Sequence, residues 1–217
     1  MKLHADLSKR AVVDTSALDW VPSPAAGVER RMLDRDGDEV ARATSIVRYA
    51  AGSDFPTHEH GGGEEFMVLE GVFSDEHGDF PAGTYVRNPV GSAHAPSTKD
   101  GCTIFVKLRQ MDPDDQEFVR VDTNEGDWIA GEIEGLFRMP LHAYGDERVC
   151  LTKMDPGCTV PSYEHAGGQE ILVLEGTLED ENGVYPKGTW LRLPAGSRHA
   201  PKSAEGCLLW VKQGHLK

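Results

Sequence analysis

The sequence predicts an all-β protein of two tandem antiparallel barrels, each a double-sheet jelly roll. Three observations support this prediction. Short apolar runs are separated by turns rich in glycine and proline. No amphipathic helix of full length appears in the 217 residues. The chain also contains an internal repeat, and duplicated units with short, regularly spaced strands are typical of paired barrels.

The repeat keeps its register over most of the chain. Residues 52–107 recur 105 positions later, in pairs such as His60 and His165, Gly71 and Gly176, Pro81 and Pro186, Gly91 and Gly196, His94 and His199, and Cys102 and Cys207. Earlier pairs, such as Trp20 and Trp128, stand 108 positions apart. The second copy therefore lacks three residues between positions 141 and 156. We expect this deletion in a hairpin tip, because loops tolerate changes in length.

The repeat also predicts the domain organisation. Residues 1–19 are polar with weak periodicity and are expected to form an N-terminal arm. The first barrel spans residues 20–111 and the second spans residues 128–217. Residues 112–127 begin with an Asp-rich stretch and are expected to be the linker.

Within the first barrel, turn chemistry separates the expected strands. Apolar strands are expected at residues 28–33 and 43–49, on either side of the Asp-rich turn 34–38. The strongly apolar strand 66–69 comes next, and residues 74–79 read as a hairpin tip. The second copy repeats this order.

Composition excludes several classes of partner. The chain has 36 acidic and 22 basic residues and a net charge of −14, which would repel nucleic acids and anionic membranes. The start of the sequence lacks the features of a signal peptide, and no apolar run is long enough to span a bilayer. Four cysteines without a dense pattern fit a reducing compartment and structural roles. We therefore expect a cytoplasmic protein.

A metal-binding pattern stands at the centre of the first copy. His58 and His60 share one face of a strand, because side chains alternate with period two. The glycines at 61–63 allow a tight reversal that delivers Glu64 to the two imidazoles. His94 follows a Pro-x-Gly turn and supplies a fourth ligand. This set predicts one divalent metal ion, zinc first, with iron, nickel or manganese as alternatives.

The second copy does not keep this chemistry. His58 is replaced by Tyr163 and Glu64 by Gln169, whereas the other two histidines persist as His165 and His199. Loss of one imidazole and the only anion weakens any divalent site. We expect about one ion per chain. The second barrel is expected to hold a hydrogen-bonded polar cluster, with a small-molecule pocket as the alternative.

Two motifs of the first copy resemble those of the cupins: His58-x-His60-x3-Glu64-x6-Gly71 and Gly83-x5-Pro89-x-Gly91-x2-His94. The stretches 63–78, 81–89 and 91–96 further resemble the cupin domain of ChrR-type anti-sigma factors. The resemblance covers both repeats and implies a bicupin. It also implies zinc on His58, His60, Glu64 and His94. ChrR-type regulators sense oxidative stress and release a sigma factor.

Three function classes follow from the residues and the resemblance. We favour a regulatory, stress-sensing protein, because three histidines and one carboxylate already complete the four ligands of a closed zinc site. The second class is a non-haem dioxygenase that cleaves diketones or hydroxyacetophenones, since iron would keep two positions free. The third class is a non-catalytic cupin that binds a small molecule.

Partners are predicted with the same alternatives. The resemblance implies a sigma factor or another protein, although the sequence lacks the His-x3-Cys-x2-Cys pattern with which ChrR-type regulators grip theirs. Arg87 and Arg192, before the Pro-x-Gly turns, are candidates for binding an anionic ligand. Strands 66–69 and 171–174 are apolar on both faces, so the other barrel or a second subunit, as in a homodimer, should cover them.

Overall fold

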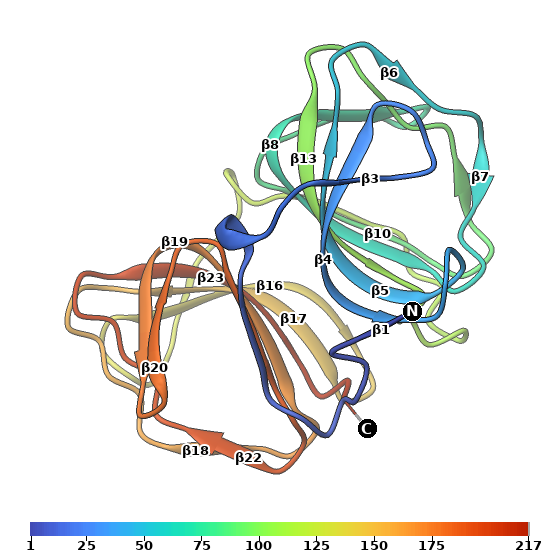
Figure 1. The fold of residues 1–217 in the computed structure, drawn as a ribbon. Helices are drawn as coiled ribbons and strands as arrows, with labels where there is room; N and C mark the ends of the chain where they lie inside the picture. Colours follow the sequence, from blue (N-terminus) through green and yellow to red (C-terminus); the bar gives the residue numbers. More distant parts are fainter. Residues whose placement is uncertain (217) are drawn as a thin grey trace. The chain divides into compact units, whose positions relative to one another are not determined.

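The computed structural model describes residues 1–216 and divides the chain into two compact units. Unit 1 contains Met1–Ala5 and Leu18–Gly126, and unit 2 contains Asp6–Ala17 and Asp127–Lys217. Each unit is an antiparallel β-barrel, which confirms the predicted fold class (Figure 1). The described residues contain one short 3-10 helix, η1 (Thr15–Ala17), and no helix with the length and hydrophobicity of a membrane span.

In unit 1 the main sheet has the order β1-β4-β5-β13-β8-β10-β14, and β7 pairs with β11 in a small second sheet. The strands of unit 1 are β1 (Lys2–Leu3), β3 (Val21–Pro22), β4 (Val28–Asp36), β5 (Arg42–Tyr49), β6 (Ser53–Asp54), β7 (His58–Glu59), β8 (Glu64–Asp75), β9 (Gly78–Pro81), β10 (Thr84–Asn88), β11 (Ala93–His94), β12 (Ser97–Thr98), β13 (Cys102–Leu108) and β14 (Val119–Asp122).

Unit 2 repeats this arrangement with the order β15-β16-β17-β23-β19-β21-β2 and a small sheet of β18 and β22. The strands of unit 2 are β2 (Ala11–Asp14), β15 (Ile129–Ala130), β16 (Leu136–Tyr144), β17 (Glu147–Met154), β18 (Tyr163–His165), β19 (Gln169–Asp180), β20 (Gly183–Pro186), β21 (Thr189–Leu193), β22 (Ser197–His199) and β23 (Cys207–Gln213).

The longest strand of each unit passes through a glycine that its neighbours require. Gly71 in β8 has a φ of 72°, and a Cβ atom there would collide with the carbonyl oxygen of Gly101. Before Gly71, β8 pairs with β10 and β13; after it, β8 pairs with β9. Gly176 has the same role in β19. This is the physical reason for the glycine that closes the first motif.

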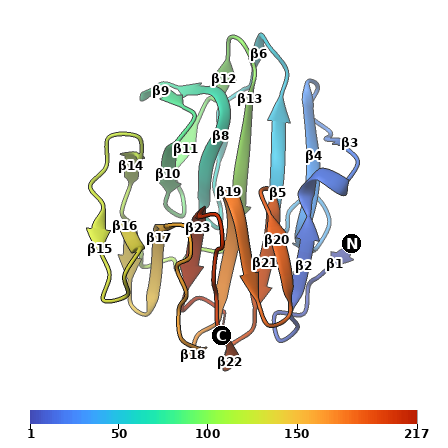
Figure 2. The same cartoon turned by 90° about the vertical axis from the view of Figure 1, so that its left-hand side faces the viewer.

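The edge strand of each main sheet comes from an unexpected part of the chain. β2, in the segment expected to be an arm, pairs with β21 of unit 2 (Figure 2). β14, in the segment expected to be a linker, pairs with β10 of unit 1. The two strands stand 108 positions apart and are repeat equivalents, with the sequences Ala-Val-Val-Asp and Val-Arg-Val-Asp. The strand that opens each copy therefore completes the barrel of the other copy.

Each barrel has its own apolar core. The core of unit 1 contains Phe66, Val68, Phe73, Phe80, Val86, Cys102, Ile104 and Val106. The core of unit 2 contains Leu136, Met154, Cys158, Val160, Ile171, Val173, Leu178, Tyr185, Leu191, Cys207, Leu209 and Val211. Glu64 has the same strand parity as Phe66 and Val68 and therefore faces the interior with them.

The four cysteines are free thiols, and three of them are fully buried. Burial raises the pKa of every one, to about 11 in Cys102. Because the thiolate is the reactive form, these thiols react slowly at neutral pH. The structure supports packing roles for them, as predicted.

Candidate metal centre

The structure brings the four predicted ligands of unit 1 together. His58, His60, Glu64 and His94 each offer a ligand atom, and these atoms all lie within 4.8 Å of one another. Glu64 Oε2 lies 3.4 Å from His60 Nε2 and 3.5 Å from His94 Nε2. His60, Glu64 and His94 are buried, whereas His58 is exposed.

Short strands and a tight turn position these side chains. His94 on β11 lies directly opposite His58 on β7 in the antiparallel ladder. The backbone N–H of His60, just after β7, donates to the Ser92 carbonyl oxygen at 2.8 Å. Gly63, with a φ of 76°, then reverses the chain so that Glu64 begins β8. A pair of short strands and a glycine turn therefore bring the predicted ligands together, as their spacing in the sequence indicates.

Hydrogen bonds to the outer nitrogens orient two of the imidazoles. His60 Nδ1 lies 3.1 Å from Ser92 Oγ, and Ser92 donates its own hydrogen to the Pro89 carbonyl oxygen. Ser92 Oγ therefore accepts from His60. His94 Nδ1 lies 3.1 Å from Asp75 Oδ2, and a carboxylate oxygen also accepts. Both rings thus carry their proton on Nδ1 and direct the lone pair of Nε2 into the site.

A second set of hydrogen bonds holds the carboxylate. Asn88 Nδ2 donates to Glu64 Oε2 at 3.0 Å, and Arg120 Nη2 donates to Asn88 Oδ1 at 2.6 Å. Asn88 lies opposite Glu64 in the ladder of β10 and β8. Arg120 lies on β14, the strand that the second copy contributes. The exchanged strand therefore positions Glu64 through Asn88.

Burial keeps the inner histidines neutral. Desolvation lowers the pKa of His60 to about 4, and it also lowers the pKa of His94. In His94, the carboxylates of Glu64 and Asp75 oppose this effect without reversing it. A neutral imidazole is the form that binds metal. Both rings are therefore ready to coordinate an ion at neutral pH.

The donor set fits a divalent metal ion. The Nε2 atoms of His60 and His94 are buried and have no hydrogen-bond partner within residues 1–216. Buried polar atoms without partners are costly, and a cation between the rings and Glu64 would satisfy both. Imidazoles with one carboxylate suit zinc, iron, nickel and manganese, the metals predicted from the sequence.

A cavity of about 330 Å³ opens beside this cluster inside unit 1. His58 and Glu64 form part of its wall, so a molecule in the cavity would approach the metal position from their side. The apolar wall consists of Val28, Ala43, Val47, Tyr49, Phe55, Val106 and Leu108, among others. Arg30 and Arg35 also line the cavity, and both guanidinium groups pair with Glu39. The cavity has the size of small ligand pockets, roughly 300 Å³ and above.

Two successive halves of the sequence each match the same family, and together they cover almost the whole chain. The family model described as the ChrR cupin-like domain matches residues 8–112 and again residues 116–217. The chain belongs to the ChrR cupin-like family. This ChrR-like cupin is therefore a bicupin, as predicted. Each match begins three residues before an exchanged strand, β2 or β14. No curated protein shows significant similarity to the sequence.

Solved structures share the fold of this ChrR-like cupin at low sequence identity. A putative dioxygenase from Nostoc punctiforme superposes with a TM-score of 0.81 at 16% identity, covering 96% of this chain and 84% of that chain. A bacterial pirin from Escherichia coli, in complex with nickel(II), gives 0.69 at 11% identity and covers 94% and 98%. Oxalate decarboxylase from Bacillus subtilis gives 0.66 at 12% identity and covers 98% and 79%.

The second copy of the ChrR-like cupin has a different cluster at the equivalent place. The ring centroids of His165 and His199 lie 4.8 Å apart, and Gln169 Nε2 donates to the Tyr163 hydroxyl at 3.4 Å. The described residues of unit 2 supply no group of three metal-ligating side chains among themselves. The number of ions per chain stays a prediction.

The carboxylate support is also missing in unit 2. Asp180 still contacts His199 Nδ1 at 3.3 Å, as Asp75 contacts His94. Asn88, however, is replaced by Leu193 at the repeat position. The position of Arg120 is taken by Val12 of β2. Unit 2 has therefore kept the carboxylate contact of one imidazole, His199, and lost the hydrogen bonds that hold a carboxylate in unit 1.

Acid should destabilise unit 2 through His165. Desolvation lowers its pKa from 6.5 to about 4 in the folded state. The unfolded state then binds the proton more readily, so the stability due to neutral His165 is present above pH 6.5 and is lost as pH falls toward 4. The full loss is about 3 kcal/mol. Urea unfolding of chelator-treated protein at several pH values should show it, and His165→Gln should reduce the pH dependence. Equal pH dependence in both proteins would contradict the assignment.

The two predicted ligand-binding arginines do not line the cavity of unit 1 described above, and both anchor the exchanged strands. Arg87 on β10 is buried and pairs with Glu65 at 3.6 Å and with Asp115, four residues before β14. Arg192, its repeat equivalent on β21, donates to the backbone carbonyl oxygens of Asp6 and Lys9, just before β2. The same position thus contacts the segment that leads into the exchanged strand in each barrel, and ligand binding by these arginines stays a prediction.

Several residues that matter for the site were not singled out from the sequence. Asp75 and Ser92 recur at the repeat offset as Asp180 and Ser197, so the repeat carried a signal for them. Asn88 recurs as leucine, in parallel with the loss of Glu64, which is a weaker signal. Arg120 gives no such signal in the sequence, because the sequence predicts a linker where its strand lies.

Proposed function

We propose that unit 1 is a metal-dependent oxygenase site for a small, largely apolar organic molecule. The observation that carries this proposal is the cavity of about 330 Å³ whose wall includes His58 and Glu64. A site that only held a structural metal would need no such space, whereas a catalytic site keeps access for a substrate. The putative dioxygenase from Nostoc punctiforme, which shares the fold, is consistent with this class.

A divalent metal, when bound, would supply Lewis acidity and, in the case of iron or manganese, redox chemistry with O2. The chain supplies the geometry. Ser92 and Asp75 hold the His60 and His94 rings with Nε2 directed inward. Asn88 holds Glu64 in place through its amide. The ligands are therefore set before the substrate enters, which reduces the cost of reorganisation.

The cavity wall determines which molecules fit. Tyr49 and Phe55 pack edge to face, with ring centroids 5.5 Å apart, and form an aromatic side of the pocket. The apolar lining excludes water and favours an aryl or alkyl group. Arg30 and Arg35 share Glu39 as their partner, so one of their two positive charges is compensated by that carboxylate. The apolar and aromatic lining suits the aryl and alkyl groups of diketones and aryl ketones.

A ChrR-type stress-sensing regulator is the second candidate. Family membership favours it, and so does the four-ligand set, which could close around zinc. A regulator would act through a sigma factor or another protein partner. On this reading the response is a change in metal occupancy or conformation on exposure to an oxidant, without turnover of a small molecule.

Loading the full chain with ferrous iron or with zinc separates the two candidates. With iron, we expect oxygen consumption with members of a panel of β-diketones and aryl ketones. The His94→Ala variant should lose this turnover by at least about a hundredfold, because it removes a ligand. His77→Ala, a change of the same type at an exposed hairpin tip of unit 1, should keep it. Metal release on oxidant exposure, with no turnover by the iron form, would favour the regulator and contradict the oxygenase proposal.

A further inference from the structure

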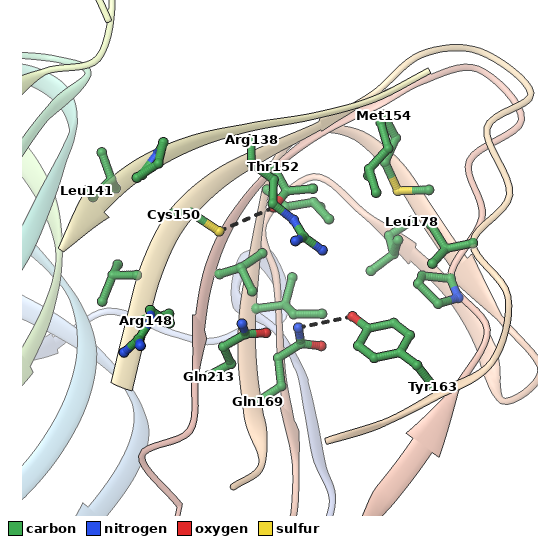
Figure 3. Close-up of a pocket in the computed structure, with 18 of the residues that line it drawn as sticks. Arg138, Leu141, Arg148, Cys150, Thr152, Met154, Tyr163, Gln169, Leu178 and Gln213 are labelled. Atoms are coloured by element: carbon green, nitrogen blue, oxygen red, sulfur yellow. Dashed lines mark hydrogen bonds between the residues drawn. The ribbon is translucent and has the colours of Figure 1, made fainter. Parts of the chain in front are cut away.

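The barrel interior of unit 2 contains a cavity of about 390 Å³ (Figure 3). Its apolar wall is formed mainly by core residues such as Leu136, Ile171, Leu178, Leu209 and Val211. The residues that replace the metal ligands, among them Gln169 and Tyr163, lie at one side of this space. The volume falls in the range of small-molecule pockets, about 300–1,000 Å³.

Two buried polar atoms at the cavity have no partner. Gln169 Oε1 and His199 Nε2 make no hydrogen bond within residues 1–216, and both side chains line the cavity. The Nδ1 atom of His199 faces the Asp180 carboxylate, so the ring proton lies on Nδ1 and Nε2 is an acceptor. Both atoms can therefore accept a hydrogen bond from a donor in the cavity. A buried acceptor without a hydrogen bond destabilises the protein, and a hydrogen bond from a ligand hydroxyl would remove this cost.

The charge of the cavity lining is opposite to that of the chain. Arg138 and Arg148 line the cavity, and no Asp or Glu among the described residues does. The protein as a whole carries a net charge of −14. Figure 3 shows Arg138 extending into the cavity above Gln169 and Tyr163. Within residues 1–216, the exposed side chain of Arg138 forms no ion pair and no hydrogen bond, so its guanidinium is available to an anion.

Comparison of the two copies explains why Arg138 is unpaired. Its repeat equivalent, Arg30, forms a bidentate pair with Glu39, at 3.0 and 3.2 Å, in the five-residue tip between β4 and β5. In unit 2 the tip between β16 and β17 consists only of Gly145 and Asp146. The three-residue deletion seen in the sequence therefore shortens the tip that carries Glu39, and among the described residues Arg138 has no carboxylate partner in its place.

We propose that unit 2 binds, without a metal, a small organic acid that carries a hydroxyl group on an apolar body. The carboxylate pairs with the Arg138 guanidinium at the cavity wall. The apolar body packs against the leucine and isoleucine wall. The hydroxyl group donates to Gln169 Oε1 or His199 Nε2. A hydroxyaryl carboxylate of arylpropanoate size has this combination of groups.

Titration calorimetry on the full, metal-free chain tests this with three probes. They are 3-(4-hydroxyphenyl)propanoate, its neutral amide, and 3-phenylpropanoate, which lacks the hydroxyl. We expect one binding event for the first probe and at least about tenfold weaker binding for each of the others. Arg138→Gln should remove the preference for the acid over the amide. Arg198→Gln, a matched change at an exposed arginine of unit 2 outside the cavity lining, should leave it unchanged.

Three outcomes would overturn the proposal. One is equal affinity for the acid and the amide, and another is an Arg138→Gln variant that keeps the preference with its fold verified by circular dichroism. The third is the absence of binding for all three probes up to about 10 mM, weaker than any functional pocket of this kind. The test does not depend on the metal centre of unit 1, since the protein is stripped of metal. Its result therefore stands apart from that of the oxygenase proposal.

Discussion

The variant His58→Tyr with Glu64→Gln is expected to take up almost no metal, because it rebuilds the ligand set of unit 2 inside unit 1. The change removes one imidazole and the only carboxylate of the cluster. Binding by four ligands is worth about 10–16 kcal/mol in closed zinc sites, so loss of two ligands should weaken affinity by roughly 10³-fold or more. Elemental analysis of protein purified without chelator gives the metal content directly.

The reciprocal pair of changes in unit 2 serves as the matched control. Tyr163→His with Gln169→Glu, together with His165 and His199, restores a set of three histidines and one glutamate. We expect a gain toward about two ions per chain, but with weaker affinity at the second site, because the support of Asn88 has no counterpart there. Tight binding of one ion by the first variant would show that the asymmetry between the copies does not control metal uptake.

A chain that ends at Asp112 is expected to aggregate or dimerise and to lose its metal site. Such a chain lacks β14, which leaves the edge of β10 unpaired and exposes it to other chains. It also loses Asp115, the partner of the buried Arg87, and removal of one member of a buried pair costs about 3–5 kcal/mol. Loss of Arg120 further removes the support of Asn88 and Glu64.

A chain that ends at Gly126 is the control for this truncation, because it retains β14 and all of unit 1. Size-exclusion chromatography with metal analysis of both chains measures the difference. We expect the longer chain to be the more soluble one and to hold about one ion. A soluble, monomeric chain ending at Asp112 with full metal content would show that the exchanged strand is not required.

Local patterns predicted the metal centre because its ligands lie in two short segments. The i, i+2 spacing of His58 and His60 fixes a shared face, and Gly63 permits a tight reversal before Glu64. The repeat then identified the altered positions of the second copy, Tyr163 and Gln169, from the sequence alone. Such inferences need only the geometry of a strand and a turn.

The exchanged strands could not be predicted in this way. β2 and β14 have only four residues each, and their partners β21 and β10 stand far away in the sequence. Pairing over such a distance is decided by the whole barrel rather than by local pattern. For the same reason local pattern could not predict that Arg87 and Arg192 contact the segments just before the incoming strands.

The sequence by itself determined the all-β class, the duplication, the four residues of the candidate metal cluster and the replacement of two of them in the second copy. All of these rest on periodicity and spacing within segments of a few residues. Only the tertiary structure decided which strand completes which barrel, that Arg120 supports Glu64 through Asn88, and that Arg138 lines a cavity with no ion pair among the described residues. These features depend on contacts between distant segments, and a local sequence pattern cannot predict the free energy of those contacts.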